Sequence, residues 1–250
     1  MNFKTLKEKM EYYRSLTDYK LMPGTYTLVM VDGHNFSRKV KNTFDKPFCD
    51  VFANLMNQTA IKICKEFQGV KFAYTQSDEI SLLMTDFDGA DSSYGYRLCK
   101  LQSLIASEAT GEFNRCLVEH LLQSSKDIQE YYKNGAYTFD CKVWQVPKES
   151  DVNGWFIYRQ NDCIRNSVSQ LAQNYFSHHE LLGKNVDEMK ELVKTKNVDW
   201  ENLRNGFKYG RIIKKENVTK FTESGEPFNR GVWKVEEQGG RFEEEIYGLL

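Results

Sequence analysis

The chain has 250 residues, 40 % of them hydrophobic and 14 % aromatic, with 34 basic residues against 35 acidic ones. This is enough apolar material for one large core, and the balanced charge excludes a protein held on nucleic acid by net charge alone. No apolar run reaches the roughly 18 residues that a transmembrane helix requires, and the charged start is not a signal peptide. We therefore expect a cytoplasmic protein with no membrane partner.

The six cysteines are spread singly along the chain. None belongs to a CxxC pair, and none is grouped with histidine at zinc-ligand spacing. Each lies in an apolar context that is typical of a small buried thiol. We expect a reducing compartment, no disulfide framework and no structural zinc.

Helical and strand patterns follow one another clearly over the first 150 residues. A polar helix over 3–15 precedes an apolar, β-rich segment over 25–31 that is typical of a central strand. Apolar residues at three- and four-residue spacing then predict a long helix over 48–67, with Pro47 in its first turn. The remaining elements are strands at 70–75 and 80–86, a second long helix at 95–122 and a strand at 138–146.

The order of these elements is β-α-β-β-α-β, the ferredoxin-like unit, in which the first strand lies beside the following hairpin in one antiparallel sheet. We therefore predict an α+β fold with an antiparallel sheet and helices on one face. Asp32 ends the first strand, and Asp78 and Glu79 lie in the turn of the hairpin. This topology brings three carboxylates that are distant in sequence to one edge of the sheet.

The part of the chain beyond residue 150 has weaker patterns. They indicate helices at 155–176, 186–196 and around 198–207, and strands at 210–216 and 228–236. These segments either extend the sheet or form a small accessory subdomain. We assign 1–150 to a catalytic domain, and 151–250 to helices and strands that complete the same catalytic body as a C-terminal α/β extension.

Neighbouring carboxylates at a sheet edge repel one another and are costly to desolvate without a cation. Mg²⁺ commonly binds through one or two carboxylates plus substrate phosphates, and a pair of such ions can serve phosphoryl transfer. Gly33, directly after Asp32, permits a close approach by a carbonyl or a triphosphate. An exposed turn is the simpler interpretation of Asp78 and Glu79 alone, but their placement beside Asp32 favours a metal site.

Basic residues that suit a triphosphate are also present. Lys46 follows the loop after Asp32, and Arg97 and Lys100 lie one helical turn apart. Each of them, taken singly, is more often a solvated surface charge. The sequence contains no GxSxG elbow, no P-loop and no GxGxxG fingerprint, so nucleophilic catalysis and dinucleotide binding have little support.

Six motifs carry a resemblance to a known family. They are "DGHNFS" after a strand, "KPF" opening a helix, "YTQSDEISLL" in a hairpin, "KLQSLIASEATGEFN" on a helix, "FDCKVW" and "YRQNDCIRNSVSQLA". Together they resemble the tRNA(His) guanylyltransferase superfamily, and more closely its guanylyltransferase-like branch of 3′→5′ RNA polymerases. The resemblance runs from about residue 20 to 215, and the first and third motifs together are the most specific.

The resemblance implies a polymerase-type palm that holds two Mg²⁺ ions through Asp32, the Gly33 carbonyl and Asp78. It implies that Asp32, Asp78 and Glu79 support catalysis. The positions that it matches to nucleotide binding are Asp32, Gly33, His34, Asn35, Phe36, Ser37, Lys46, Ser77 and Asp78. The positions that it matches to phosphate or tRNA-end binding are Arg97, Lys100, Arg159 and Asn166.

The chain departs from the eukaryotic guanylyltransferases at several positions. It has "IRNS" at 164–167 where those enzymes have "HINN", and the guanylyltransferase-like proteins typically have an "RNS" form. Met30 stands where the eukaryotic enzymes have arginine, and Lys142 replaces a usual arginine, keeping the charge but not the planar fork. These differences place the chain closer to the like-proteins than to enzymes that add guanosine to tRNA(His).

The function that the resemblance implies is nucleotide addition to the 5′ end of tRNA in the 3′→5′ direction, with template-dependent repair of 5′-truncated tRNA as the task. The implied substrates are GTP and ATP, the partner is tRNA or another structured RNA, and the assembly is a homotetramer. The alternatives are addition of G to tRNA(His), a nucleotidyl cyclase on the same palm, and a non-catalytic RNA-binding protein on a decayed palm. The "RQNDCIRNS" stretch disfavours the cyclase, and the presence of both Asp32 and Asp78 disfavours the decayed palm.

Overall fold

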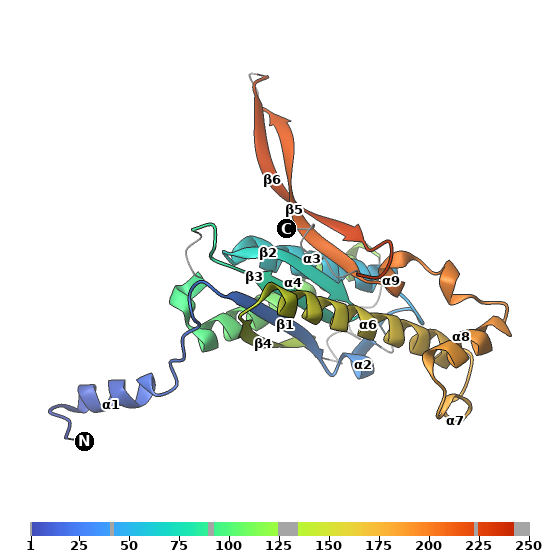
Figure 1. Cartoon of the computed structure of the whole chain (residues 1–250), viewed down its shortest axis with the longest axis horizontal. Helices are drawn as coiled ribbons and strands as arrows, with labels where there is room; N and C mark the ends of the chain where they lie inside the picture. Colours follow the sequence, from blue (N-terminus) through green and yellow to red (C-terminus); the bar gives the residue numbers. More distant parts are fainter. Residues whose placement is uncertain (1, 41–42, 90–92, 125–134, 223–224, 243–250) are drawn as a thin grey trace.

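The centre of the molecule is an antiparallel sheet, seen in a computed structural model that describes residues 2–40, 43–89, 93–124, 135–222 and 225–242. Within these residues the sheet has six strands in the order β4-β1-β3-β2-β5-β6 (Figure 1). The strands are β1 Tyr26–His34, β2 Val70–Gln76, β3 Glu79–Met84, β4 Thr138–Val146, β5 Arg211–Phe221 and β6 Pro227–Glu237. All neighbouring pairs are antiparallel.

Helices connect and cover the strands. The longer ones are α1 Leu6–Ser15, α3 Asp50–Glu66, α4 Leu98–Gln123, α6 Glu149–Gln173 and α8 Val186–Lys194. The shorter ones are α2 Phe36–Lys39, η2 Ser93–Tyr96, α7 His178–Leu181, η3 Trp200–Asn202 and α9 Asn205–Lys208. No described helix is long and apolar enough to cross a membrane.

The predicted β-α-β-β-α-β unit is confirmed: β4-β1-β3-β2 is the strand order of a ferredoxin-like sheet. Alternate side chains of the central strands point to the face that α3 and α4 cover, as the two-residue period of a strand requires. Val29, Val31, Ile80 and Leu82 on this face are buried in one core cluster with residues of α3 and α4. The helices of the unit therefore lie on one face, as expected.

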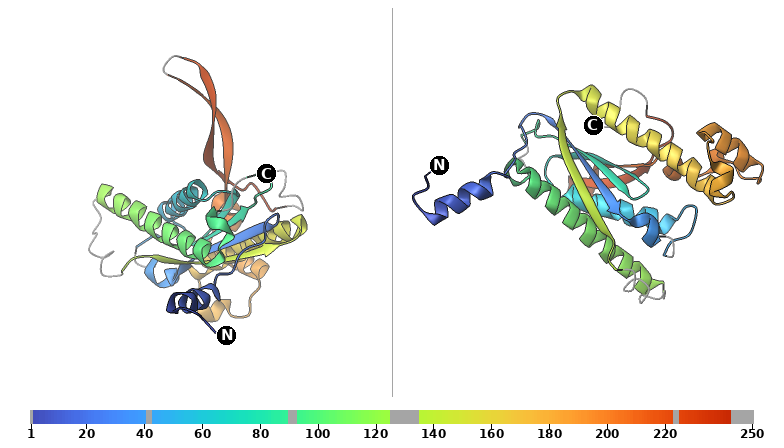
Figure 2. Two further views of the ribbon diagram at one scale, coloured as in Figure 1. Left: turned by 90° about the vertical axis from the view of Figure 1, so that its left-hand side faces the viewer. Right: turned by 90° about the horizontal axis from the view of Figure 1, so that it is seen from below.

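The opposite face of the sheet is covered by α6, which sequence reasoning did not predict. Leu28, Phe72 and Leu83 on this face are buried against Val152 and Phe156 of α6. Figure 2 shows α4 and α6 on opposite sides of the sheet in its right-hand view. The C-terminal half of α6 continues past the sheet and packs against α8 and η3 in a separate cluster.

Several predicted boundaries need correction. The long helix expected over 48–67 begins at Asp50, because Cys49 has an extended backbone and caps it, so Pro47 lies before the helix. The predicted first strand extends to His34, since β1 and β4 stay paired as far as His34 and Thr138. The helix expected around 198–207 is instead two short pieces, η3 and α9.

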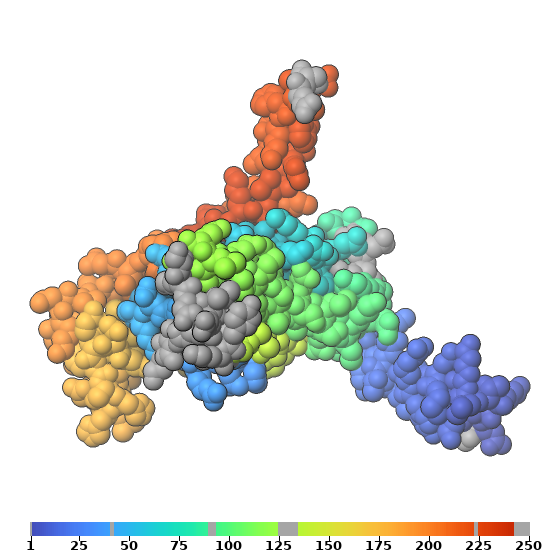
Figure 3. Space-filling model, turned by 180° about the vertical axis from the view of Figure 1, so that it is seen from behind, coloured from blue at the N-terminus to red at the C-terminus, as the bar shows by residue number. Residues whose placement is uncertain are grey.

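The last two strands extend the sheet and then leave it. β2 pairs with only the first four residues of β5, from Arg211 to Lys214, whereas β5 and β6 stay paired up to Phe221 and Pro227. The rest of the hairpin projects from the body (Figure 1). In the space-filling view from behind, this hairpin, α1 and the α7–α8 region protrude in different directions (Figure 3).

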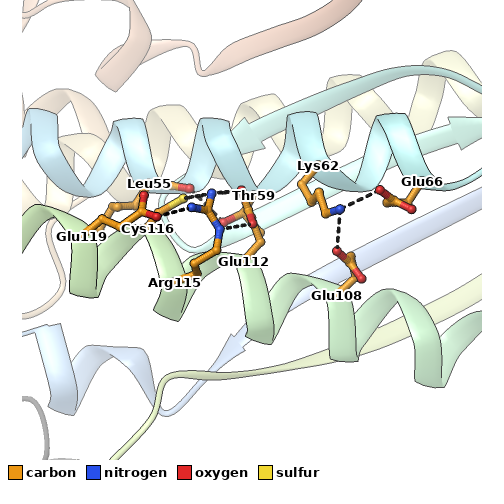
Figure 4. A network of polar contacts seen from close by, with 9 residues as sticks. All are labelled: Leu55, Thr59, Lys62, Glu66, Glu108, Glu112, Arg115, Cys116 and Glu119. Carbon is orange, nitrogen blue, oxygen red and sulfur yellow. Dashed lines mark hydrogen bonds and ion pairs between the residues drawn. The ribbon is translucent and has the colours of Figure 1, made fainter.

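Charged side chains join α3 to α4 on the outside of the core (Figure 4). Lys62 of α3 pairs with Glu66 at 2.6 Å and with Glu108 of α4 at 3.3 Å. Arg115 of α4 pairs with Glu112 at 2.7 Å and with Glu119. These arginine and lysine charges are therefore balanced by carboxylates, which is the usual arrangement on a helical surface.

All six cysteines are free, and their environments differ more than the sequence suggests. Cys64 and Cys163 are buried, as expected from their apolar context. Cys99, near the start of α4, is exposed, and Cys49, Cys116 and Cys141 are partly buried. The expectation of a buried thiol is therefore wrong for Cys99 and holds only in part for Cys49, Cys116 and Cys141.

Candidate active site

The end of β1 and the β2–β3 turn meet, as the topology predicts. Asp32 of β1 lies opposite Glu79, the first residue of β3. The Gly33 amide donates a hydrogen bond to the Asp78 carbonyl at 3.1 Å, which ties the end of β1 to the turn. Ser77 has a left-handed backbone with φ of 47°, and this conformation lets the chain reverse between β2 and β3. The predicted convergence of Asp32, Asp78 and Glu79 is confirmed.

A row of polar side chains crosses the sheet at this end, on the face that α6 covers. Asp140 of β4, Asp32 of β1, Glu79 of β3 and Gln76 of β2 occupy successive register positions. Residues paired in register share a face of the sheet. Asp32 therefore has a second carboxylate, Asp140, beside it, and this neighbour was not among the predicted site residues.

Glu79 has a protein cation as its partner. Arg159 of α6 donates from Nε to Glu79 Oε1 at 2.8 Å and from a terminal nitrogen to the other carboxylate oxygen. Both side chains are largely buried, with 6 % of the Glu79 side chain and 11 % of that of Arg159 exposed. Arg159 also pairs with Asp162 at 2.7 Å. These contacts satisfy the guanidinium within the protein, so its predicted role in phosphate binding stays a prediction.

Asp32 and Asp78 differ from Glu79 in that neither forms an ion pair with a described residue. Burial is the main cause that raises the pKa of Asp78, to about 6, and the nearby Asp32 charge adds to it. Burial, followed by repulsion from Asp140, raises the pKa of Asp32. These two acids are held close together, are partly withdrawn from water and form no ion pair with a described residue, which disfavours their ionised forms.

This donor set fits Mg²⁺. The ion prefers oxygen ligands and often uses only one or two carboxylates, with substrate phosphates and water completing its shell. Asp32 and Asp78 supply two carboxylates whose raised pKa values a divalent cation would reverse. No group of three or more histidine, cysteine or acidic side chains among the described residues is arranged to hold a metal without such help.

In the loop after β1, some side chains are exposed near the site and others are buried in the core. His34 and Asn35 contact each other, with 2.8 Å between Nε2 and Nδ2, and both are exposed. Phe36 is only 1 % exposed and packs against Phe113 and Tyr137. Because the Phe36 side chain is buried in the core, only the main chain of Phe36 is available to contact a nucleotide, and that contact stays a prediction.

A cavity of about 430 Å³ opens beside the turn that carries Asp78. It lies between the segment before α3, the C-terminal half of α6, and the region of α9 and β5. Its lining includes four residues that were predicted to bind nucleotide or phosphate: Ser37, Lys46, Ser77 and Asn166. The volume lies within the range of ligand-binding pockets.

Arg97 and Lys100 lie at the other end of the sheet. Both follow β3, which runs about 17 Å from Glu79 to Met84. Arg97 pairs with Asp18 at 2.8 Å, and Lys100 lies over the ring of Tyr94. The structure does not bring these two cations to Asp32 and Asp78, and Arg97 caps α4 rather than belonging to it.

The comparisons with known proteins agree with this geometry. The family model for tRNAHis guanylyltransferase matches residues 7–147, more than half of the chain. The chain belongs to the tRNA(His) guanylyltransferase family. It is an enzyme of the nucleotidyltransferase class, with the fold that its sequence resemblance implied.

Solved structures support this family assignment over nearly the whole chain. A bacterial tRNA(His) guanylyltransferase-like protein in complex with ATP is 31 % identical, with a TM-score of 0.78, and the match covers 93 % of this chain and 92 % of that one. A bacterial guanylyltransferase-like protein in complex with GTP is 27 % identical, with a TM-score of 0.73, and covers 94 % and 92 %. The tRNA(His) guanylyltransferase of Debaryomyces hansenii is 27 % identical over 97 % of this chain and 93 % of its own.

Sequence reasoning missed three parts of this family member's site. Asp140 lies inside the quoted "FDCKVW" motif, and the pairing of its strand with the one that carries Asp32 was the available signal. The Glu79–Arg159 pair joins residues 80 positions apart, and no local sequence pattern predicts such a contact. Arg211, from the start of β5, lines the cavity although no motif includes it.

Proposed function

We propose that this enzyme adds nucleotides to the 5′ end of tRNA in the 3′→5′ direction and that it repairs 5′-truncated tRNA using the opposite strand of the acceptor stem as template. The observation that carries the proposal is a pair of acids, Asp32 and Asp78, that form no ion pair with a described residue and lie beside a cavity large enough for a nucleotide. The relatives solved with ATP and with GTP support nucleoside triphosphates as substrates.

In the proposed reaction the 3′-hydroxyl of an incoming nucleotide attacks the α-phosphorus at the RNA 5′ end. A phosphorus–oxygen bond forms there, and pyrophosphate leaves from a triphosphate end, or AMP from a monophosphate end first adenylylated by ATP. The hydroxyl proton passes to solvent. Two bound Mg²⁺ ions would lower the pKa of the attacking hydroxyl and neutralise the leaving phosphate.

The residues of this chain have separate parts in that reaction. Asp32 and Asp78, with the Gly33 carbonyl, would hold the metal ions, while Lys46 and Ser77 would contact phosphate in the cavity. Glu79 forms an ion pair with Arg159, and its part is to fix the position of α6 relative to the turn that carries Asp78. Asn166 and its neighbour Ser167 both line this cavity, and the Ser167 hydroxyl also accepts a hydrogen bond from Trp200.

Templated repair is favoured over guanosine addition to tRNA(His) by the "IRNS" form at 164–167, which the sequence resemblance links to the guanylyltransferase-like proteins. By the same resemblance we propose a homotetramer that binds tRNA.

The test is nucleotide addition to a tRNA that lacks its first 5′ nucleotide, with Mg²⁺ and each nucleoside triphosphate separately. We expect addition only of the nucleotide complementary to the opposite acceptor-stem base. Asp78→Ala should be inactive, whereas Asp187→Ala, in the exposed first turn of α8, should be as active as wild type. Addition of G to a complete tRNA(His) whatever the opposite base would establish the guanylyltransferase alternative, and conversion of nucleotide without RNA would establish the cyclase.

A further inference from the structure

Arg211 is a buried cation that the proposed mechanism leaves without a role. It is the first residue of β5, lies opposite Thr75 of β2, and is 4 % exposed. Its neighbour Ile213 on the same face packs into the core between the sheet and α3. The Arg211 side chain therefore points toward α3, where it meets Asn57.

The described contacts of Arg211 do not balance its charge. Its Nε donates to Asn57 Oδ1 at 3.0 Å, and one terminal nitrogen donates to the Gly206 carbonyl at 3.1 Å. A guanidinium carries five N–H donors, so further donors remain for a ligand. Among the described residues, no carboxylate forms an ion pair with Arg211, in contrast to Arg115, Arg159 and Arg204, each of which has two.

Arg211 also lines the cavity beside the Asp78 turn. Lys46 lines the same cavity from the segment before α3, so two cations from distant parts of the chain face one space. Among the described residues that line it, Asp45 is the single acid. Amide and hydroxyl side chains supply much of the remaining polar lining, including Gln76, Ser77 and Asn166. The charge of the cavity therefore suits an anion.

The burial of an unpaired guanidinium carries a cost in the ligand-free protein. Removing a charge from water is unfavourable unless a counter-charge and hydrogen bonds replace the water, and burial lowers the pKa of Arg211 accordingly. Arginine matches the forked geometry of phosphate better than lysine does. A buried cation that is incompletely compensated, and that faces a cavity, is therefore expected where a phosphate group binds.

We propose that Arg211 is a phosphate-binding residue of this cavity, and that together with Lys46 it holds the polyphosphate of a nucleoside triphosphate or of an RNA 5′ end. The proposal deepens the proposed function and rests on it for the identity of the ligand. It assigns a direct part in substrate binding to the region after α9, beyond the residues 7–147 that the family model matches.

The first experiment measures binding of inorganic tripolyphosphate to the full chain by calorimetry, in EDTA and without RNA. We expect Arg211→Met to bind at least about tenfold more weakly than wild type, the size of a lost charge-assisted hydrogen bond. Arg115→Met is the matched control, since Arg115 lies on α4 and is already paired with Glu112 and Glu119. The control should bind tripolyphosphate as wild type does.

Thermal unfolding separates a binding role from a structural one. If Arg211 serves the ligand, ligand-free Arg211→Met should unfold at a temperature equal to or above that of wild type. Tripolyphosphate should raise the unfolding temperature of wild type and of Arg115→Met more than that of Arg211→Met. A variant that unfolds at a much lower temperature yet binds tripolyphosphate unchanged would show a purely structural role. If Arg211→Met does not fold, Arg211→Lys is tested in its place. Weaker binding of tripolyphosphate than by wild type supports a forked contact between the guanidinium and phosphate, and unchanged binding overturns that contact.

The second step identifies the source of the phosphate. The same variants are tested with GTP and ATP, and with an RNA hairpin carrying a 5′-triphosphate against the same hairpin with a 5′-hydroxyl. The ligand whose affinity falls with Arg211→Met is the one that Arg211 holds. If wild type does not bind tripolyphosphate, or if no ligand depends on Arg211, the inference is overturned. Since no metal or reaction is involved, that result leaves the Asp78 test of nucleotide addition unaffected.

Discussion

Adjacent acids at one turn are both at least partly buried, which raises the pKa of each, but they differ in their charged partners. Glu79 is neutralised by Arg159 at 2.8 Å, while Asp78 has no described ion-pair partner. The difference arises because Glu79 begins β3 and points toward α6, whereas Asp78 belongs to the turn itself. We therefore propose different tasks for two acids that are neighbours in the sequence: Glu79 fixes the turn against α6, and Asp78 binds a metal ion.

The pKa of Asp78 leads to a prediction about pH. It rises from the ordinary value of 3.8 to about 6 in the folded protein, because burial disfavours the charged form. The folded state thus holds this proton more tightly than the unfolded state, so the stabilisation that the proton provides is complete below about pH 4 and is lost as pH rises through about 6. Asp78→Asn removes this loss.

We therefore expect metal-free Asp78→Asn to be more stable than wild type at pH 7.5, by about 3 kcal/mol, and the difference to shrink toward pH 4. Urea unfolding in EDTA across this pH range measures the effect. Mg²⁺ should stabilise wild type and not the variant. A difference in stability that does not change with pH would contradict this account.

At the scale of elements, the Glu79–Arg159 pair ties β3 to α6. The pair is buried, and Ser81 adds a hydrogen bond to Glu79 Oε1 at 3.1 Å. Buried ion pairs contribute little net stability, but removing one partner leaves a buried charge alone. The pair therefore serves mainly to fix how α6 sits on the sheet.

Glu79→Gln should cost about 3–5 kcal/mol of unfolding free energy, because it leaves Arg159 buried with only Asp162 as a charged partner. The double variant Glu79→Leu with Arg159→Met should recover most of this stability but not the activity. Denaturant unfolding of the two variants, with the exposed Glu119→Gln as control, measures the stability, and the nucleotide-addition assay measures the activity. Equal losses in the single and double variants would show that the pair itself stabilises the fold.

At the scale of the whole molecule, the central strands of the sheet are buried on both faces. α3 and α4 cover one face, and α6 covers the other with Val152 and Phe156. β5 also pairs with β2, so the C-terminal part supplies both a layer and a strand neighbour. The two halves of the chain therefore form a continuous structure around one sheet.

We expect residues 1–150 alone not to fold. Without α6, the apolar side chains on one face of the sheet would be exposed to water: Leu28, Phe72, Tyr74 and Leu83. Circular dichroism in the near ultraviolet and dye binding would show a loss of fixed packing. As a control, replacing 218–230 of the hairpin by a short turn should keep the fold, because these residues lie beyond the paired part of β2. Cooperative unfolding of the 1–150 fragment would instead make it an independent domain.

The strand and helix order of the first 150 residues could be predicted because it depends on local patterns. The 138–146 strand matches β4, and Asp32 does meet Asp78. The misplaced start of α3 and the division at 198–207 arise where capping and packing, rather than periodicity, decide the boundary. The placement of α6 was not predictable, since an amphipathic pattern does not say which surface it will cover.

The sequence by itself determined the family, the ferredoxin-like sheet and the two acids at its edge, because each depends on residue types at short spacing or on the rules of strand connection. Only the tertiary structure decided which acid is neutralised, which cations reach the cavity and which do not. Arg159 and Arg211 were brought to the site, and Arg97 was left at the far end of the sheet. The physical reason is that side-chain electrostatics depends on distance and burial, and both are set by the packing of elements that are far apart in the sequence.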